Sequence, residues 1–532
     1  METTQHIQQE MDVLRDENAS FKATIDSHKA TIDSHKAMID SHKAMIDSLR
    51  QYVLQLEEFI RHGRHKQFGA SSEQLSDLQP SLFDEPEIAS ADGAVCVDES
   101  TEAEAGTEAK PARKPRKPFR IPPELPRVDI VHDLTEAEKV CPHDGATLKH
   151  IDSEILEQLD IIPARVQVLR HIRYTYACPC CDQHMMTAQK PKQPIEKSMA
   201  SPRMLATIAT QKYVDGMPLY RQEQLFARLG LELDRTTQAN WMVKCGKLIQ
   251  PLINLIHEQM LEQPVLHMDE TRVQVLDEPG KSPQSQSYMW VMRSVERPAV
   301  LFHYSPTRSS EVPKQLLDDY HGALMVDGYE GYSAVCADPS ITRLGCWAHA
   351  RRGFVDAKKA YGSGRTGKAD EALAHIQALY RIEQNAKDNP PEERLALRQA
   401  QATPVITALK QWLDTNINRI APKSLLGKAM YYLNHQWPRL IRYLEDGRFP
   451  IDNNPAENAI RPFVIGRKNW LFSASQHGAD ASANLYSLIE TAKANALEPH
   501  AYLTHVFTEL PNARTLLDIE TLLPWAVKDG VR

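Results

Sequence analysis

The chain has 532 residues, 25% of them charged and 42% hydrophobic, which predicts a multidomain protein with a large core. Its formal net charge of −8 excludes a globally basic protein, so any contact with nucleic acid must come from local basic patches. No apolar run approaches a membrane span and the N-terminus is polar, so we expect a cytoplasmic protein with no membrane partner.

The N-terminal segment, residues 1–62, contains four copies of a seven-residue repeat at 23–50: ATIDSHK, ATIDSHK, AMIDSHK, AMIDSLR. With Ile25 at position a, the register holds for eight heptads and seven of the eight a positions are apolar, which predicts a coiled coil and a homodimer or larger oligomer. Asn18 at a is a residue type that sets parallel dimer register. Histidines fill three d positions, either through duplication of the unit or as a pH-sensitive or metal-binding seam.

A basic segment follows at 63–83, with Arg64 and Lys66 beside Phe68. It is interpreted either as a solvated helix end or as an element that contacts DNA. Residues 84–127 are an acidic tract and then a proline-rich basic arm, neither of which can pack a core, so they predict a linker.

Residues 128–190 carry two cysteine clusters, CPHDG and CPCCDQH, with an alternating stretch before the second that predicts strands. Cys178 and Cys181 have the spacing of a zinc knuckle, and Cys141 supplies a third sulfur ligand. Asp144 stands where a second pair would end, so the fourth ligand is His143, Cys180 or His184. We predict a structural Zn²⁺ site of Cys141, His143, Cys178 and Cys181. The alternative is a metal-free remnant of a zinc ribbon.

Residues 191–260 predict helices: LYRQEQLFARLG is ended by Gly230, and Asp234 or Thr236 begins the next helix. The pair is either a helix-turn-helix or an ordinary helical hairpin that supports the next domain. The side chains available to DNA in the first case are Arg235, Gln238, Asn240 and Lys244.

Residues 261–350 predict three strands, a helix, a strand, a helix and a fifth strand, the pattern of a ribonuclease-H-like fold. Asp269 and Asp327 each follow a short apolar run, so both are expected at the carboxyl ends of strands, where ligands bind. The stretch 351–448 is mainly helical, with a break at DNPPEE, and predicts a helical insertion. Further helices are expected at 478–532.

The stretch DNNPAENAIRPFVIGRKNW at 452–470 places Glu457 near cations on one expected helix face. The conservative interpretation is a surface ion pair between Glu457 and Arg461. Together with Asp269 and Asp327, however, Glu457 completes three acids suited to hold two Mg²⁺ (or Mn²⁺) ions that act on a phosphodiester. The basic side chains expected to bind phosphates are Arg461, Arg467 and Lys468, with Trp470 stacking near a base.

The chain resembles the insertion sequence 66 family of bacterial transposases over nearly its whole length. The resemblance rests on HKQFGASSEQL, CPHDG with YACPCC, KYVDGMPLYRQEQLFARLG, HMDET, VDGYEGY, CWAHARR and DNNPAENAIRPFVIGRKNWLFS. It implies that Asp269, Asp327 and Glu457 form a D-D-E metal triad, that small companion proteins are needed, and that the protein is bacterial and nucleoid-associated.

The predicted fold class is a multidomain α+β protein with an N-terminal coiled coil, a zinc-ribbon-like module and a ribonuclease-H-like α/β catalytic core. The core comprises residues 261–350 and 449–477. The leading function is a DNA transposase that cleaves element ends and joins the 3′-hydroxyls to target DNA, with terminal inverted repeats and target DNA as partners. Alternatives are a non-catalytic DNA-binding regulator or relic, and a nuclease of the same fold without strand transfer.

Overall fold

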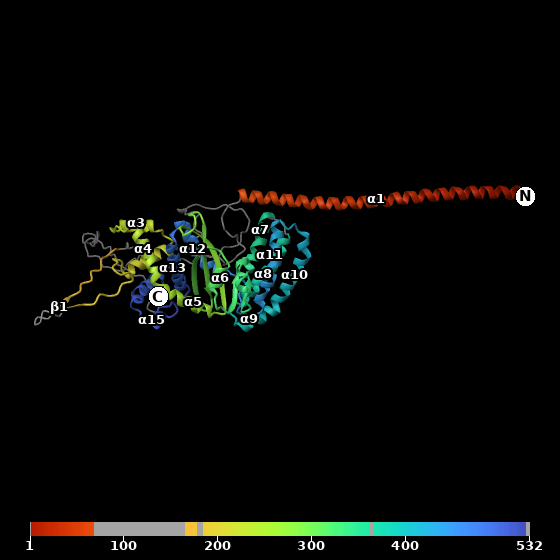
Figure 1. Cartoon of the computed structure of the whole chain (residues 1–532). Coiled ribbons are helices and arrows are strands. Elements are labelled where there is room, and N and C mark those ends of the chain that lie inside the picture. The colour runs from red at the N-terminus through yellow and green to blue at the C-terminus, as the bar shows by residue number, and fades with distance from the viewer. Residues whose placement is uncertain (1, 69–164, 178–184, 362–366, 528–532) are drawn as a thin grey trace, which may run out of the picture. The chain divides into compact units, whose positions relative to one another are not determined.

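A computed structural model describes residues 2–68, 165–177, 185–361 and 367–527 (Figure 1). The four expected zinc ligands and the linker lie outside the described residues, as does the basic segment after Phe68. Within the described ranges, no helix is both long and apolar enough to cross a membrane.

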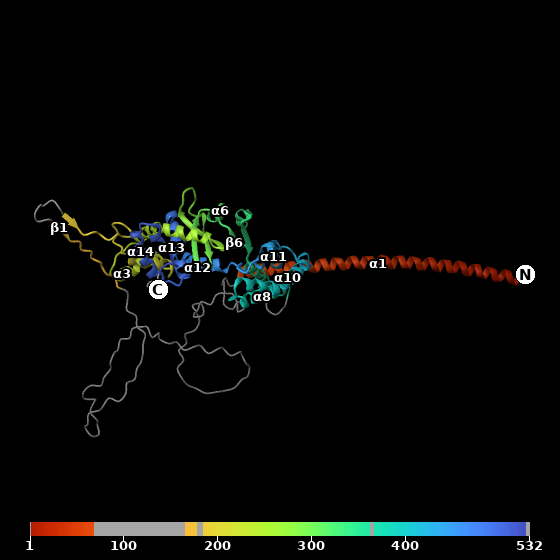
Figure 2. The same cartoon turned by 90° about the horizontal axis from the view of Figure 1, so that it is seen from below.

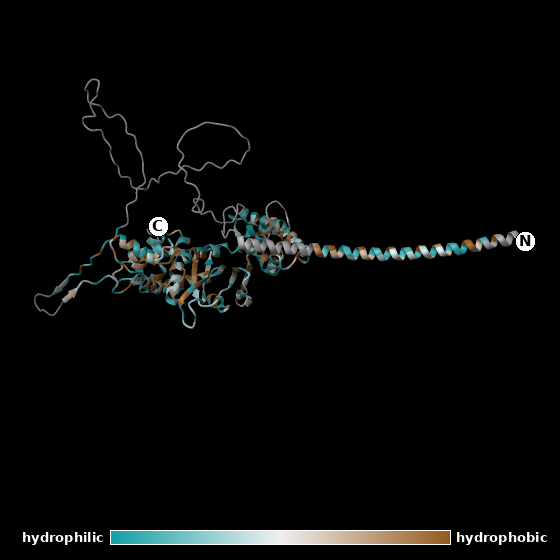
Figure 3. Ribbon diagram, turned by 90° about the horizontal axis from the view of Figure 1, so that it is seen from above, coloured by the Kyte–Doolittle hydropathy of each residue, from teal (hydrophilic) through white to brown (hydrophobic). Residues whose placement is uncertain are grey.

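The N-terminal segment forms one helix, α1 (Glu2–Phe68), as the heptads predict. Hydrophobic residues recur along it (Figure 3), and the a-position residues Ile25, Ile32, Ile39 and Ile46 are each about half exposed. Ion pairs three residues apart, such as Lys29–Asp26, line another face. The helix therefore presents an unpartnered apolar stripe to solvent within the described chain.

The expected strands before the second cysteine cluster are mostly absent from the described residues. Only β1 (Thr175–Ala177) and β2 (Met185–Thr187) pair, antiparallel, and residues 165–174 have no regular structure. The alternating pattern was therefore misleading for 165–174, because alternation makes a strand only where another strand supplies its hydrogen bonds.

Four helices precede the main sheet: α2 (Pro202–Tyr213), α3 (Leu219–Arg228), α4 (Arg235–Leu248) and α5 (Gln250–Leu261). Gly230 adopts a φ of +82° just after α3, and the carboxylate of Asp234 accepts the N–H groups of Thr236 and Thr237 at the start of α4. Both boundaries agree with the sequence prediction. Apolar faces of α2, α4 and α5 pack into the main core.

The main sheet has the order β5-β4-β3-β6-β7, and a short strand β8 (Ser473–Ser475) pairs with the far end of β3. Strands β3 (Val265–Asp277), β4 (Gln286–Ser294) and β5 (Ala299–Ser305) are antiparallel neighbours. Strands β6 (Gly322–Val326) and β7 (Ile341–Gly345) run parallel to β3. The sheet is therefore mixed, and β3 is the strand at which the pairing direction changes.

The connection from β5 to β6 contains an α-helix, whereas the connection from β6 to β7 contains only short 3-10 helices. Helix α6 (Glu311–Leu316) precedes β6, as expected. Between β6 and β7 the expected helix is replaced by two short 3-10 helices, Glu330–Tyr332 and Val335–Ala337. The intervening sequence DGYEGYSAVCADPS is too short and too rich in glycine and turn residues to sustain α-helical turns.

Between β7 and α12 the described chain is helical. It forms α7 (Trp347–Tyr361), α8 (Lys368–Asn385), α9 (Pro391–Leu397), α10 (Thr403–Asn416) and α11 (Leu425–Leu440). These helices enclose a second hydrophobic core, which includes Trp347, Phe354 and Leu409, and Figures 1 and 2 show α8, α10 and α11 as one group.

The chain then returns to the sheet through α12 (Asn454–Trp470), α13 (Gln476–Ala494), α14 (Pro499–Glu509) and α15 (Leu516–Glu520). Helix α13 covers the open edge of β5. The hydroxyl of Thr491 accepts the N–H of Val300 and donates to its carbonyl, both at 3.0 Å, and Ser487 accepts the N–H of Phe302 at 2.7 Å. Ser487 and Thr491 are four residues apart on the helix, a rise of about 6.0 Å, and their partners Phe302 and Val300 are two residues apart on the strand, about 6.8 Å. The two spacings match, so both hydroxyls can reach the strand edge. Side-chain hydroxyls thus replace a further strand.

Replacing Thr491 with valine should destabilise the fold by about 1–3 kcal/mol, because both main-chain groups of Val300 lose a buried partner. The control is Thr508→Val, because the exposed Thr508 hydroxyl bonds only a carbonyl of its own helix and its loss should cost less than about 0.5 kcal/mol. Urea unfolding of both full-length variants measures the difference. Equal stability of the two variants would show that the hydroxyls do not secure the edge.

Candidate active site

The two aspartates lie where β6 ends beside β3. Parallel pairing joins Val265 to Ala323 and His267 to Met325, and continuing this register by two residues puts Asp269 beside Asp327. Asp327 directly follows β6, as predicted. The expectation that Asp269 ends its strand is wrong, because β3 continues to Asp277 as a hairpin with β4. Adjacent strands are about 4.8 Å apart. The carboxylate of Asp269, within β3, and that of Asp327, in the loop after β6, therefore lie at the same edge of the sheet.

Asn453 fixes the start of α12 against this edge. Its Nδ2 donates to the carbonyl of Met268 at 2.8 Å, its Oδ1 accepts from Nδ1 of His267 at 3.0 Å, and its N–H donates to Sγ of Cys346 at 3.2 Å. Burial lowers the pKa of His267 to about 4, so that ring is neutral. Asn453 is fully buried, and Glu457 follows one helical turn later.

Asp269 is the acid whose ionisation is most disfavoured. Burial is the main cause that raises its pKa well above the usual value, followed by the charges of Glu270, Glu457 and Asp327, while a hydrogen bond from the N–H of Glu270 opposes the shift. Charges from three parts of the chain therefore act on one carboxyl group. A cluster of this kind is relieved by a proton or by a bound cation.

A fourth acid, Glu270, was not singled out from the sequence. Its side chain is 2% exposed, forms an ion pair with Arg308 and accepts a hydrogen bond from the hydroxyl of Tyr332 at 2.6 Å. Burial raises the pKa of Glu270, and the partners Tyr332 and Arg308 oppose this. The Arg308 guanidinium also stacks on Tyr329, 3.7 Å from the ring centroid. These contacts hold the loop that carries Asp327.

Glu457 contacts α7, which the sequence did not predict. Nη2 of Arg352 donates to Oε2 at 3.1 Å, and Nδ1 of His349 lies 3.4 Å from Oε1. Both residues belong to the CWAHARR motif, so a motif match was the one signal that pointed to them. Burial lowers the pKa of His349, and the charge of Glu457 opposes this. Helix α7 therefore forms one wall of the site.

The cations expected on α12 differ in their surroundings. Lys468 is exposed and Arg461 is partly buried. Arg467 donates to Oγ1 of Thr271 at 3.0 Å and to the carbonyl of Arg272, so it ties α12 to β3, and its contact with DNA stays a prediction. The ring of Trp470 packs against the main core, with Nζ of Lys212 4.2 Å from its centroid, and its stacking on a base likewise stays a prediction.

Among the expected DNA contacts of α4, Arg235, Asn240 and Lys244 are exposed. Gln238 is fully buried and donates to the carbonyl of Leu233, so its expected availability to DNA is wrong. Arg64 and Lys66 belong to the C-terminal part of α1, and their contacts with DNA stay predictions.

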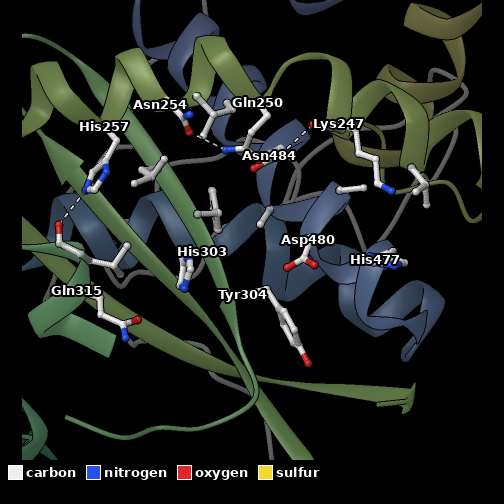
Figure 4. A pocket seen from close by; sticks show the side chains of 18 residues that line it. Lys247, Gln250, Asn254, His257, His303, Tyr304, Gln315, His477, Asp480 and Asn484 are labelled. Carbon is white, nitrogen blue, oxygen red and sulfur yellow. Dashed lines mark hydrogen bonds between the residues drawn. The ribbon is translucent and has the colours of Figure 1, made fainter. Parts of the chain in front are cut away.

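A cavity of about 610 Å³ lies away from these acids, between α4, α5, α13 and β5 (Figure 4). His257 and His303 line it, and the Nε2 atom of His257 contacts the carbonyl of Leu316 at 2.8 Å. Burial and the nearby His257 lower the pKa of His303. Asp269, Asp327 and Glu457 are not among its lining residues, so it is separate from the acidic site.

Asp269→Asn should stabilise the protein in the absence of divalent cations, because a raised pKa means that ionised Asp269 opposes folding. The stability that Asp269 contributes is present below its unfolded pKa of about 3.9 and is lost as pH rises through the folded pKa. The advantage of the variant should therefore grow as pH rises above about 3.9, by at most about 1.4 kcal/mol per pH unit, and should stop growing once pH exceeds the folded pKa.

Thermal unfolding in magnesium-free buffer, without a chelator that strips zinc, measures this difference. Asp277→Asn, an exposed acid at the end of the same strand, is the control and should change little. A destabilised Asp269→Asn variant at pH 8 would contradict the electrostatic account.

Comparison with known proteins identifies the chain's relatives. The model of the Transposase IS66 family matches residues 197–481, and the IS66 C-terminal element matches residues 487–525. Residues 138–182 match the zinc-finger binding domain of transposase IS66, and residues 55–130 match the model described as Transposase C of IS166 homeodomain.

Three similar proteins come from Sinorhizobium fredii (strain NBRC 101917 / NGR234). The uncharacterized protein y4jD is 32% identical over 89% of this chain and 94% of its own length. The uncharacterized proteins y4qI and y4hP are 30% and 29% identical, over 90% and 79% of this chain and 89% and 78% of their own lengths. A family match over more than half of the chain and a relative of this coverage lead to one conclusion: the chain belongs to the Transposase IS66 family.

Proposed function

We propose that the protein is a DNA transposase that cleaves the ends of its mobile element and joins the 3′-hydroxyls to target DNA. Asp269, Asp327 and Glu457 are its catalytic acids in this proposal. The observation that carries it is geometric: the parallel register of β3 and β6 brings Asp269 next to Asp327, and Asn453 holds the first turn of α12, which bears Glu457, against β3. Family membership supplies the reaction class, and the acids supply the chemistry.

The donor set fits two divalent cations, Mg²⁺ or Mn²⁺. Carboxylate oxygens are the ligands that these hard ions prefer, and Oε1 of Glu457 is a buried acceptor without a hydrogen-bond partner among the described residues. Bound cations would activate the attacking oxygen and stabilise the leaving oxygen of the phosphodiester. Asp269, Asp327 and Glu457 would be the residues that hold these cations.

The protein's own residues position this site. Asn453 holds the first turn of α12 against β3, and Arg352 orients Glu457 through its Oε2 atom. Glu270 forms an ion pair with Arg308, and Arg308 stacks on Tyr329 in the loop that carries Asp327. Glu270 therefore helps to hold that loop in place. We infer a ribonuclease-H-like core for this arrangement, supported by three antiparallel strands followed by two parallel ones. The core comprises 261–350 and 449–477, with 351–448 as its helical insertion.

DNA binding is assigned to local basic groups, because the net charge of −8 gives no global attraction. Partly buried Arg461 and exposed Lys468 follow Glu457 along α12, and exposed Arg235 and Lys244 lie on α4. Arg64 and Lys66 at the end of α1 complete the proposed set, which would bind terminal inverted repeats and target DNA.

Four further parts of the proposal concern the zinc site, self-association, companion proteins and location in the cell. Cys141, His143, Cys178 and Cys181 hold a structural Zn²⁺, an assignment supported by the zinc-finger match at 138–182. The exposed apolar stripe of α1 forms a coiled coil that makes the protein a homodimer or larger. Small companion proteins of the same element take part in transposition. The protein acts at the bacterial nucleoid.

Asp269→Asn, Asp327→Asn and Glu457→Gln should each reduce cleavage and strand transfer by at least about a thousandfold, because each removes an ionised ligand. Binding to the same DNA should survive, since affinity comes from the basic groups. Labelled oligonucleotides that carry the inverted repeats flanking the reading frame report both reactions.

Asp277→Asn is the matched control, because Asp277 lies on β3 as Asp269 does, and this variant should retain activity. Full cleavage by the Asp327→Asn variant would refute the mechanism. Specific binding without cleavage by the unaltered protein, with Mg²⁺ or Mn²⁺ and companion proteins present, would instead favour the DNA-binding regulator.

Ile39→Lys should weaken self-association at least tenfold, because it puts a charge at an a position of the coil. Ala37→Lys, two residues earlier at an outward-facing f position, should leave association unchanged. Sedimentation equilibrium of the full-length variants compares them. If both variants associate as strongly as the unaltered protein, the apolar stripe of α1 is not the dimer interface.

A further inference from the structure

His349 and Glu457 face each other without a hydrogen bond. His349 is the third residue of α7, and its Nδ1 atom lies 3.4 Å from Oε1 of Glu457. Both atoms are buried, and neither has a hydrogen-bond partner within the described parts of the chain. A buried polar atom without a hydrogen-bond partner destabilises the folded state by about 1–3 kcal/mol. A group bound between the two atoms would remove this penalty.

The other polar atoms nearby are already engaged. Oε2 of Glu457 accepts from Arg352, which leaves Oε1 to face the imidazole. Sγ of Cys346 lies within 4.8 Å of one ring nitrogen of His349 and one carboxylate oxygen of Glu457, but it accepts the N–H of Asn453 and so helps to position α12. Nη1 of Arg352 is 3.5 Å from Nε2 of His349, at the limit of a hydrogen bond, and therefore does not fix the tautomer.

We propose that Nδ1 of His349 is a ligand, together with Glu457, of one of the two divalent cations in the acidic site. Two metal–ligand bonds of about 2.1 Å reach as far as about 4.2 Å, so one ion can contact both atoms across the observed gap. The inference rests on the proposed function, because it assumes that Glu457 holds a cation.

A nitrogen ligand makes the two cation positions chemically different. The position of Asp269 and Asp327 offers only carboxylates, which suit Mg²⁺. An imidazole nitrogen binds divalent transition-metal ions better than it binds Mg²⁺. The cation position formed by Glu457 and His349 therefore prefers Mn²⁺ over Mg²⁺. His349 thereby becomes a determinant of metal preference that the sequence motif CWAHARR did not reveal by itself.

The test uses full-length protein with its zinc retained, titrated with Mn²⁺ and followed by electron paramagnetic resonance. Pulsed spectra of the unaltered protein should contain ¹⁴N modulation from one directly bound imidazole. His349→Gln should abolish this modulation and weaken Mn²⁺ binding at least roughly tenfold, with a smaller change for Mg²⁺ measured by competition.

Two further variants guard the interpretation. His349→Asp puts an oxygen near the place of Nδ1, so it should bind Mn²⁺ more tightly than His349→Gln while still lacking the nitrogen signal. His435→Gln removes an α11 histidine that instead pairs with Glu330, and it should keep both the signal and the affinity.

Bound Mn²⁺ without ¹⁴N modulation in the unaltered protein would overturn the inference, even if His349→Gln lowered affinity, because His349 would then act only through Glu457. In that case, loss of Mn²⁺ in Asp269→Asn and Glu457→Gln would leave the proposed function intact. Mn²⁺ binding indifferent to all three acids would overturn both.

Discussion

The hydrogen bonds of Asn453 are the constraint on which the acidic site depends. One buried side chain joins two residues of β3, through the carbonyl of Met268 and the ring of His267, while its N–H reaches Cys346 at the end of β7. These contacts fix the start of α12 against two strands at once. Only an amide supplies both the donor and the acceptor in this place, since a carboxylate would lose the bond to Met268.

The pairing of β3 with β6 ends earlier than its pairing with β4. Its first residues pair in parallel with β6, whereas its later residues continue with β4 after β6 has ended. Asp269 lies two residues beyond the last pair with β6, and Asp327 lies in the loop that leaves β6. Glu270 and Glu457 add negative charge, which Arg308 and Arg352 partly offset. The fold thus keeps repelling carboxyl groups together, an arrangement that sacrifices stability for function.

The sequence predicted most elements but not the contacts between them. The helix of the heptad segment, the Asp234 cap and the strand before Asp327 follow from local patterns, and each was found where expected. The length of β3 was missed, because its apolar run stops at Asp269 while the polar alternation beyond it depends on pairing with β4. The α7 contacts of Glu457 join residues about a hundred positions apart, and no local pattern encodes such a distance. Asn453 was likewise visible only as part of a motif.

The central claim is that Asp269, Asp327 and Glu457 hold divalent cations together. Anomalous diffraction from crystals of the full-length protein grown with Mn²⁺ and element-end DNA tests it most directly. The account predicts Mn²⁺ peaks within bonding distance of all three carboxylates. Peaks that contact only one of the acids, or a Glu457 side chain directed away from the metal, would contradict it.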